Sequence, residues 1–174
     1  AEIWRHFKTV EIAFSIDDVD QRFEYQRTNA VWTEVCDNIK KFKELRKELK
    51  NIQLQVCCTV NVFNVRYLEE VAQWIVRQNF DFVYWNIMHD AWFFSVASLP
   101  DPAKKQIVEY LQTAEIPASF KVEFERICEF INHGASTDGF ITRMRIRDLD
   151  RKRQQNLKNI APELAALLEY DYNA

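Results

Sequence analysis

The sequence predicts an α/β fold with about three parallel strands and flanking helices, followed by a helical C-terminal extension. Three apolar segments read as strands: Val10 to Ile16, Ile52 to Val60 and Phe82 to Ile87. Amphipathic helical patterns follow the first two, and strand–helix alternation implies parallel strands. Glycine is scarce, with 2 residues in 174, which leaves few of the special turns that all-β folds need.

The composition limits the function classes. The 48% of hydrophobic residues is enough for a real core, and the net charge of −3 gives no overall basic field. Such a charge does not favour nucleic acid or an anionic membrane as a partner. No apolar run is long enough to span a bilayer, and no charged-then-apolar signal peptide opens the chain. We therefore expect a cytoplasmic protein that binds neither nucleic acid nor membrane.

A polar stretch and then an amphipathic helix are predicted after the first strand. After Val10 to Ile16, the polar stretch Asp18 to Asn29 is expected to be an irregular functional loop. Asn29 or Thr28 is a candidate cap for the helix that comes next. That helix has one apolar face, at steps of three and four: Trp32, Val35, Ile39, Phe42, Leu45 and Leu49.

The second strand, Ile52 to Val60, alternates apolar and polar residues, so we expect one face to be less buried. A helix over Val65 to Gln78 follows, with Asn64 as a candidate N-cap that would then be purely structural. The third strand, Phe82 to Ile87, is nearly all apolar and is expected to be central in the sheet. The aromatic stretch His89 to Leu99 either covers a pocket or packs in the core.

The rest of the chain has a helical pattern, which divides it into residues 1–100 and an extension over 101–174. One apolar stripe runs from Phe120 to Ile131 and ends at Asn132-His133-Gly134, a good stop signal. The charged segment Arg143 to Arg153 contains Asp148 and Asp150, which offer its basic residues internal partners. A nucleic-acid patch is therefore not favoured in this segment.

The cysteines and histidines lack metal-ligand spacing, so no metal site is predicted within the chain. Cys57 and Cys58 are adjacent on a strand and point to opposite faces. We expect reduced thiols that mostly pack as small hydrophobes, the alternative being a site shared with another chain. The residues concerned are Cys36, Cys57, Cys58, Cys128, His6, His89 and His133.

Each predicted strand ends in polar side chains, which are expected to converge because ligand sites of parallel α/β folds form at the carboxyl ends of the strands. A cofactor is the expected occupant. The three clusters are Ser15, Asp17 and Asp18; Thr59, Asn61 and Asn64; and Asn86, His89 and Asp90.

The order and spacing of several short motifs resemble radical S-adenosylmethionine enzymes. Phe14-Ser15-Ile16-Asp17-Asp18, followed by Phe23 to Arg27 and Trp32, resembles a strand ending in Ser-Ile-Asp before an Arg and a helix. The run Cys58 to Val65 resembles the fifth strand and its loop, and Phe82 to Asn86 the sixth strand. The tail, Leu149 to Leu157 with Pro162-Glu163-Leu164, resembles the subgroup with a "twitch" extension that is often seen in phage genomes.

The resemblance implies a partial, TIM-like (β/α) barrel that binds S-adenosylmethionine across the strand ends, against a [4Fe–4S] cluster. Ser15 would hydrogen-bond the cofactor and Arg27 would pair with its carboxylate. Thr59, Asn61 and Asn64 would line the fifth-strand side, Asn86 would line the sixth, and Asp17 would hold the loop or meet substrate. The plainer alternatives are loop hydrogen bonds for Ser15 and Asp17, and an ion pair of Arg27 with Glu24.

One departure from the family is serious, because the chain has no C-x-x-x-C-x-x-C motif to hold the cluster. We therefore expect the C-terminal half of such an enzyme, inactive alone, with a missing N-terminal half or another chain as its partner. Peptides or proteins are the substrates that relatives with such extensions suggest. The alternative function is a non-catalytic α/β interaction module. A hydrolase using His89 and Asp90 has no G-x-S-x-G motif to support it.

Overall fold

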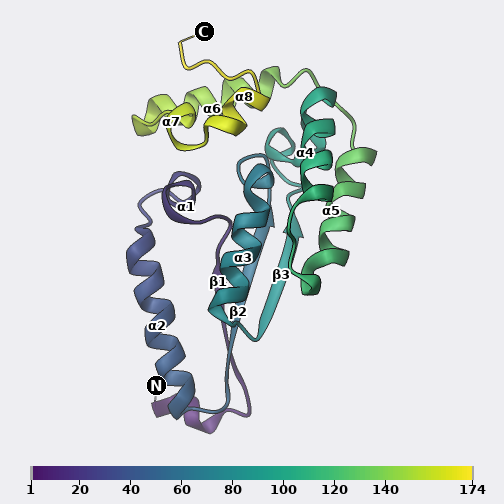
Figure 1. The fold of residues 1–174 in the computed structure, drawn as a ribbon. Coiled ribbons are helices and arrows are strands. Elements are labelled where there is room, and N and C mark those ends of the chain that lie inside the picture. Colours follow the sequence, from purple (N-terminus) through teal and green to yellow (C-terminus); the bar gives the residue numbers. More distant parts are fainter. Residues whose placement is uncertain (1, 174) are drawn as a thin grey trace.

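The fold is an open, three-stranded parallel sheet with helices, seen in a computed structural model that describes residues 2–173 (Figure 1). The strands are β1 (Val10–Ser15), β2 (Ile52–Val60) and β3 (Phe82–Ile87), in the order β1-β2-β3. The predicted α/β class and parallel strands are confirmed. The three strand positions were read from the sequence to within one residue.

Strand register sets which side chains share a face. Val10 lies opposite Ile52 and Ser15 opposite Cys57, while Gln55 lies opposite Phe82 and Val60 opposite Ile87. Successive side chains of a strand point to opposite faces, so the odd-numbered residues of β1 and β2 share one face with the even-numbered residues of β3. We call this the open face: Glu11, Ala13, Ser15, Gln53, Gln55, Cys57, Thr59, Phe82, Tyr84 and Asn86.

The other face of the sheet is covered by helices. From α2 (Trp32–Glu48), Phe42 and Leu45 pack near Leu54, and from α3 (Leu68–Gln78), Val71 and Ile75 are buried in the main core. Burying side chains of this size contributes about 1.5–3 kcal/mol each. The open face has no such cover along its edge strands, where its residues of β1 and β3 are exposed. The lower burial predicted for one face of β2 therefore follows from cover on one side only.

The third strand lies at an edge of the sheet and is not central as predicted. Phe82 and Tyr84 are 46% and 53% exposed, because within residues 2–173 β3 pairs only with β2 and its even-numbered residues lie on the open face. Trp85, on the covered face, packs edge-on against Phe120 and Phe124. The apolar sequence of β3 therefore does not indicate whether the strand is central or at an edge of the sheet.

The stretch after β1 is largely helical, which corrects the prediction of an irregular loop. Helix α1 (Asp20–Gln26) buries Phe23 and Tyr25. Neither Asn29 nor Thr28 caps α2, since the N-cap position is Val31 and makes no side-chain cap bond. Glu24 accepts the Trp32 backbone N–H at 2.7 Å instead. The carboxylate of α1 thus satisfies the first amide of α2.

The remaining elements form the helical extension predicted from the sequence. They are α4 (Asp101–Thr113), α5 (Lys121–His133), α6 (Phe140–Arg153), α7 (Leu157–Ile160) and α8 (Pro162–Leu167). Short 3-10 helices are η1 (Glu2–His6), η2 (Val65–Tyr67), η3 (Trp92–Phe94), η4 (Val96–Ser98) and η5 (Ala118–Phe120). Within residues 2–173, every helix falls short of the length and apolarity that a bilayer crossing requires.

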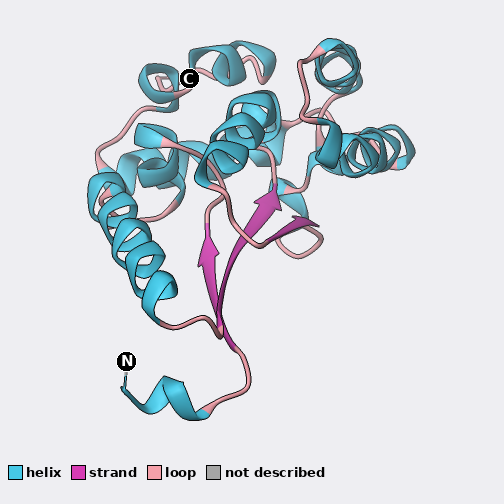
Figure 2. Cartoon of the chain, turned by 60° about the horizontal axis from the view of Figure 1, so that its bottom comes forward, coloured by secondary structure: helices cyan, strands magenta, loops and turns pink. Residues whose placement is uncertain are grey.

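The extension is hydrogen-bonded to the segment that follows each strand, beyond the arrowheads in Figure 2. After β1, the Tyr25 hydroxyl donates to Asp150 Oδ1 at 2.9 Å. After β2, the Tyr67 hydroxyl donates to Glu163 Oε2 at 2.8 Å, and after β3 the Phe93 carbonyl accepts from the Thr142 hydroxyl at 2.7 Å. Helices α6 and α8 therefore help to position the segments that follow all three strands.

Asp150 is a fully buried carboxylate of this extension. Its carboxylate accepts three hydrogen bonds, from the Tyr25 hydroxyl, the Tyr170 hydroxyl at 2.6 Å and the Leu157 backbone N–H at 2.8 Å. Burial and the bond to this carboxylate raise the pKa values of both tyrosines. These three partners are two tyrosines and a backbone amide, whereas the sequence pointed to the basic residues of Arg143 to Arg153 as partners of this carboxylate.

Candidate ligand site at the strand ends

Asp17 joins the ends of β1 and β2 to the chain after α1. Its Oδ1 accepts the Thr59 backbone N–H at 2.8 Å, and its Oδ2 accepts from Arg27 Nη2 at 2.6 Å and Nε at 3.0 Å. Asp17 is 7% exposed, whereas the Arg27 side chain is 37% exposed. Arg27 is thus paired with Asp17 and not with Glu24. Of the two roles considered for Asp17, holding the loop is the one that its bonds match.

Asn64 is fully buried and holds two strand ends together. Its side-chain N–H groups donate to the carbonyls of Asp17 at 2.7 Å and Thr59 at 2.9 Å, and its side-chain oxygen accepts the Asn61 N–H at 2.9 Å. It makes no cap bond to η2. Asn64 does occupy the predicted N-cap position, at the start of η2, but its side chain holds the preceding backbone and does not cap the helix.

Asn61 has a similar part in the loop after β2. It is 5% exposed, and its amide donates to Gln26 Oε1 at 3.1 Å and to the Thr59 carbonyl at 3.0 Å. Its side-chain oxygen accepts the Phe63 N–H at 2.8 Å. Asn61 is thus bonded within the loop and to α1.

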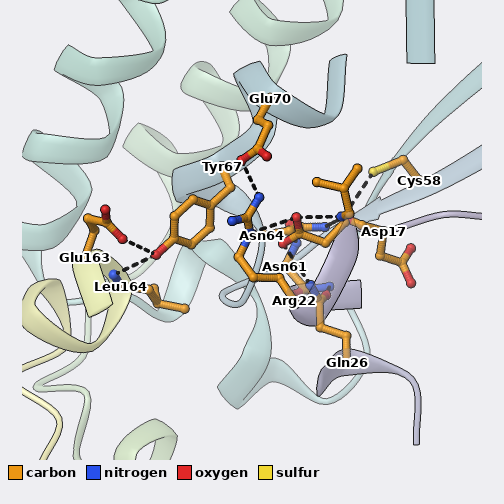
Figure 3. Close-up of polar contacts among 12 residues, drawn as sticks. Asp17, Arg22, Gln26, Cys58, Asn61, Asn64, Tyr67, Glu70, Glu163 and Leu164 are labelled. Atoms are coloured by element: carbon orange, nitrogen blue, oxygen red, sulfur yellow. Dashed lines mark hydrogen bonds and ion pairs between the residues drawn. The ribbon is translucent and has the colours of Figure 1, made fainter. Parts of the chain in front are cut away.

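A network around buried Asp18 continues from this cluster, and Figure 3 labels two of its members, Arg22 and Gln26. Asp18 accepts the Val19 N–H at 2.8 Å, Arg22 Nε at 3.0 Å and Gln26 Nε2 at 3.2 Å. Burial raises its pKa to about 7, against the opposing effect of Arg22. Sequence reasoning missed Arg22 and Gln26, although spacings of four and eight from Asp18 indicate one helix face.

Arg22 extends the network toward the helical extension. Its Nη2 bonds Glu70 Oε2, and its guanidinium lies 4.2 Å from the centre of the Tyr67 ring. Tyr67 in turn donates to Glu163, and burial together with that bond raises the Tyr67 pKa. The chain of contacts in Figure 3 runs from Arg22 across Tyr67 of η2 to Glu163 of α8.

Three other predicted site residues lie on the open face, at its carboxyl end. Thr59 lies opposite Asn86 in the strand register, and Ser15 lies in the row that continues through Cys57 to Tyr84. Neighbouring strands are about 4.8 Å apart, so Thr59 and Asn86 are adjacent. Ser15 and Asn86 are exposed and Thr59 is partly exposed. These hydroxyl and amide groups, unlike Asn61 and Asn64, are accessible to a ligand.

His89 and Asp90 lie apart from this arrangement. Both are exposed, and the His89 ring packs edge-on against Phe130 with ring centres 5.1 Å apart. Two surface hollows, of about 550 Å³ beside Arg66 and about 570 Å³ between α4 and α5, are lined by none of the strand-end residues. The candidate site is therefore a sheet face and not an enclosed pocket.

The four cysteines of residues 2–173 are free thiols, one on α2, two on β2 and one on α5. Cys58 is buried, its thiol lies 3.8 Å from the Asp17 carbonyl, and burial raises its pKa well above the usual value. Cys57 lies on the open face, as the predicted alternation requires. Within residues 2–173, no three His, Cys, Asp or Glu side chains converge as a metal site. These residues do not provide the ligands of an iron–sulfur cluster.

Comparisons of the chain with family models, curated proteins and solved structures find no significant match.

Proposed function

We propose that this chain is the cofactor- and substrate-facing part of a radical S-adenosylmethionine enzyme, corresponding to the C-terminal half of a partial (β/α) barrel. The observation that carries the proposal is the set of Ser15, Thr59 and Asn86 at the carboxyl end of the open face, beside the Asp17–Arg27 pair. In parallel α/β folds that end of the sheet is the ligand side.

The proposed barrel is supported by the placement of the helices, which cover one face of the sheet. A sheet closed into a barrel has helices outside and side chains inside, and the open face with its small and polar residues matches an inner face. β1 would be completed by a further strand from an N-terminal half or from another chain. Within residues 2–173 it pairs only with β2.

Groups at the strand ends match the chemistry of the cofactor. The Ser15 hydroxyl, the Thr59 hydroxyl and the Asn86 amide would hydrogen-bond its ribose and amino-acid parts. Arg27 has five N–H donors, of which Asp17 takes two, so others can meet the carboxylate. Asp17 then orients Arg27, and buried Asn61 and Asn64 act indirectly by holding the loop.

The [4Fe–4S] cluster does not fit the described residues, and we assign it to the partner half or chain. When bound, such a cluster supplies the electron for reductive cleavage of the sulfonium. This chain alone is accordingly proposed to bind the cofactor and to be inactive, with a peptide or protein as substrate of the whole enzyme.

Nuclear magnetic resonance titration with S-adenosylmethionine tests the proposal. We expect chemical-shift changes at the amides of Ser15, Arg27, Thr59 and Asn86. Ser15→Ala or Arg27→Gln should lower the affinity for the cofactor at least several-fold. Thr33→Ala and Arg77→Gln remove the same groups from exposed positions of α2 and α3 and are expected to leave the affinity unchanged. Shifts away from the strand ends, or their absence at millimolar cofactor, would contradict cofactor binding.

A non-catalytic interaction module is the second candidate. The observation in its favour is that Asp17, Asn61 and Asn64 bond to the protein itself, as residues do that merely stabilise loops. This function predicts no cofactor shifts and a concentration-dependent mass by size-exclusion chromatography. The titration and the mass together separate the two functions.

A further inference from the structure

The open face carries one charged side chain among its ten residues, Glu11 near the amino end of β1. Glu11 is exposed, and Gln55 of β2 donates to its Oε2 through Nε2 at 2.9 Å. Gln55 is 6% exposed, so this bond fixes one oxygen of the carboxylate from a buried neighbour. Among residues 2–173, no partner is seen for the second oxygen, Oε1, which can therefore accept from a ligand.

Two exposed aromatic rings lie across the same face from Glu11. Phe82 is opposite Gln55 and Tyr84 is opposite Cys57 in the register of β3 on β2. Aromatic faces attract organic cations and also cover their apolar stems. The open face thus combines one negative charge, amide groups and two aromatic surfaces, without a Lys or Arg among its residues.

We propose that the open face binds an organic cation, a primary amine or guanidinium on an apolar stem, with Glu11 as the anionic partner. Because a strand rises about 3.3 Å per residue, Glu11 lies about 13 Å from Ser15. A ligand that reaches both ends is therefore about four extended residues long, which is the size of a short peptide with a basic side chain.

This inference deepens the proposed function, because the cation is then the substrate, and its substrate role rests on that proposal. Binding of the cation itself does not require the cofactor. A neutral or anionic peptide lacks the charge that Glu11 complements, and an anion would in addition be repelled.

The test uses N-acetyl-lysine methylamide and its uncharged counterpart N-acetyl-norleucine methylamide. Side-chain amide signals of Gln53 and Gln55 report binding in solution. We expect the lysine probe to bind about five-fold more tightly, the size of an exposed ion pair. Glu11→Gln should abolish that preference, while Glu34→Gln, the same change on the exposed surface of α2, should retain it.

Equal binding of the two probes, or a preference that survives Glu11→Gln, overturns the inference. The cofactor titration with Glu11→Gln separates it from the proposed function, since this variant should bind S-adenosylmethionine like the parent. A lysine preference without cofactor binding means that the cation site exists and the proposed enzyme function fails. Cofactor binding without the lysine preference means that the proposed function is supported and that the cation site does not exist.

Discussion

The Thr59 backbone N–H donates a hydrogen bond of 2.8 Å to the carboxylate of Asp17. Asp17 lies two residues after the end of β1, so this bond joins the ends of β1 and β2. Arg27 donates to the second carboxylate oxygen of Asp17. One carboxylate therefore fixes two strand ends and the guanidinium that we propose as a cofactor ligand. This makes the strand ends sensitive to a change of a single charge.

Asp17→Asn is expected to lower the free energy of unfolding by about 2 kcal/mol. The reason is that the asparagine amide places its N–H group against either the Thr59 backbone N–H or the Arg27 guanidinium, both of which are donors. Urea denaturation measures the change. The control is Asp37→Asn, which removes an exposed carboxylate paired with Lys40 on α2 and should leave stability unchanged. Equal stability of Asp17→Asn and the parent would mean that the bonds of Asp17 do not hold the strand ends.

Asp18 is expected to make stability depend on pH. Burial raises its pKa from 3.8 to about 7, so the folded protein keeps a proton that the unfolded chain loses between these values. The contribution to the free energy of unfolding is thus full below about pH 4. It falls by on the order of 1 kcal/mol per pH unit as the pH rises toward 7.

Asp18→Asn does not titrate and should remove this fall. Urea titrations at several pH values between 4.5 and 7, for the parent and the variant, give the difference in slope. Asp37, whose pKa Lys40 holds below its usual value, titrates below this range, so Asp37→Asn should keep the parental slope. Parallel profiles of Asp18→Asn and the parent would exclude a raised pKa at Asp18.

Asp150→Ala is expected to cost about 3 kcal/mol or more, because it leaves two tyrosine hydroxyls and one backbone N–H without their acceptor in the core. Thermal and urea unfolding measure the loss. Asp148→Ala, an exposed change two residues earlier on α6, should have little effect. In the parent, ultraviolet titration should find Tyr25 and Tyr170 ionising above the usual tyrosine range, and Asp150→Ala should move them back toward it.

Gly134→Ala is expected to destabilise by about 1–3 kcal/mol through steric overlap. A Cβ atom at Gly134 would lie 2.5 Å from the Ala97 Cβ and 2.7 Å from its Cα, so η4 or the end of α5 has to shift. Asn132→Ala, on the exposed side of the same helix end, introduces no such contact. A melting temperature for Gly134→Ala equal to that of Asn132→Ala would show that this approach tolerates a methyl group.

Much of the fold was predictable from local patterns. The alternation of β2, the apolar stripe of α2 and the stop at Gly134 each depend on nearby residues, and the corresponding elements were found. The centrality of β3 was predicted wrongly, since strand order depends on the packing of whole helices. Helix α1 was missed because its seven residues contain only two buried side chains, Phe23 and Tyr25.

The candidate site divides in the same way. The predicted polar residues do follow the three strands, but the sequence cannot separate Ser15 and Asn86, which are exposed, from Asn61 and Asn64, which are buried. Nor did it indicate the link from Tyr25 to Asp150, 125 positions later. Such contacts depend on where the extension returns to the strand ends.

The order of the amino acids alone was enough for the α/β class, the parallel strands and the polar groups at their ends, because periodicity and turn chemistry act over a few residues. Tertiary structure alone decided that Arg27 pairs with Asp17, that β3 lies at an edge, and that Glu11 shares an uncovered face with Phe82 and Tyr84. These features arise from the register of distant segments, and hydrogen bonds and burial between such segments are specified only when the whole chain has packed.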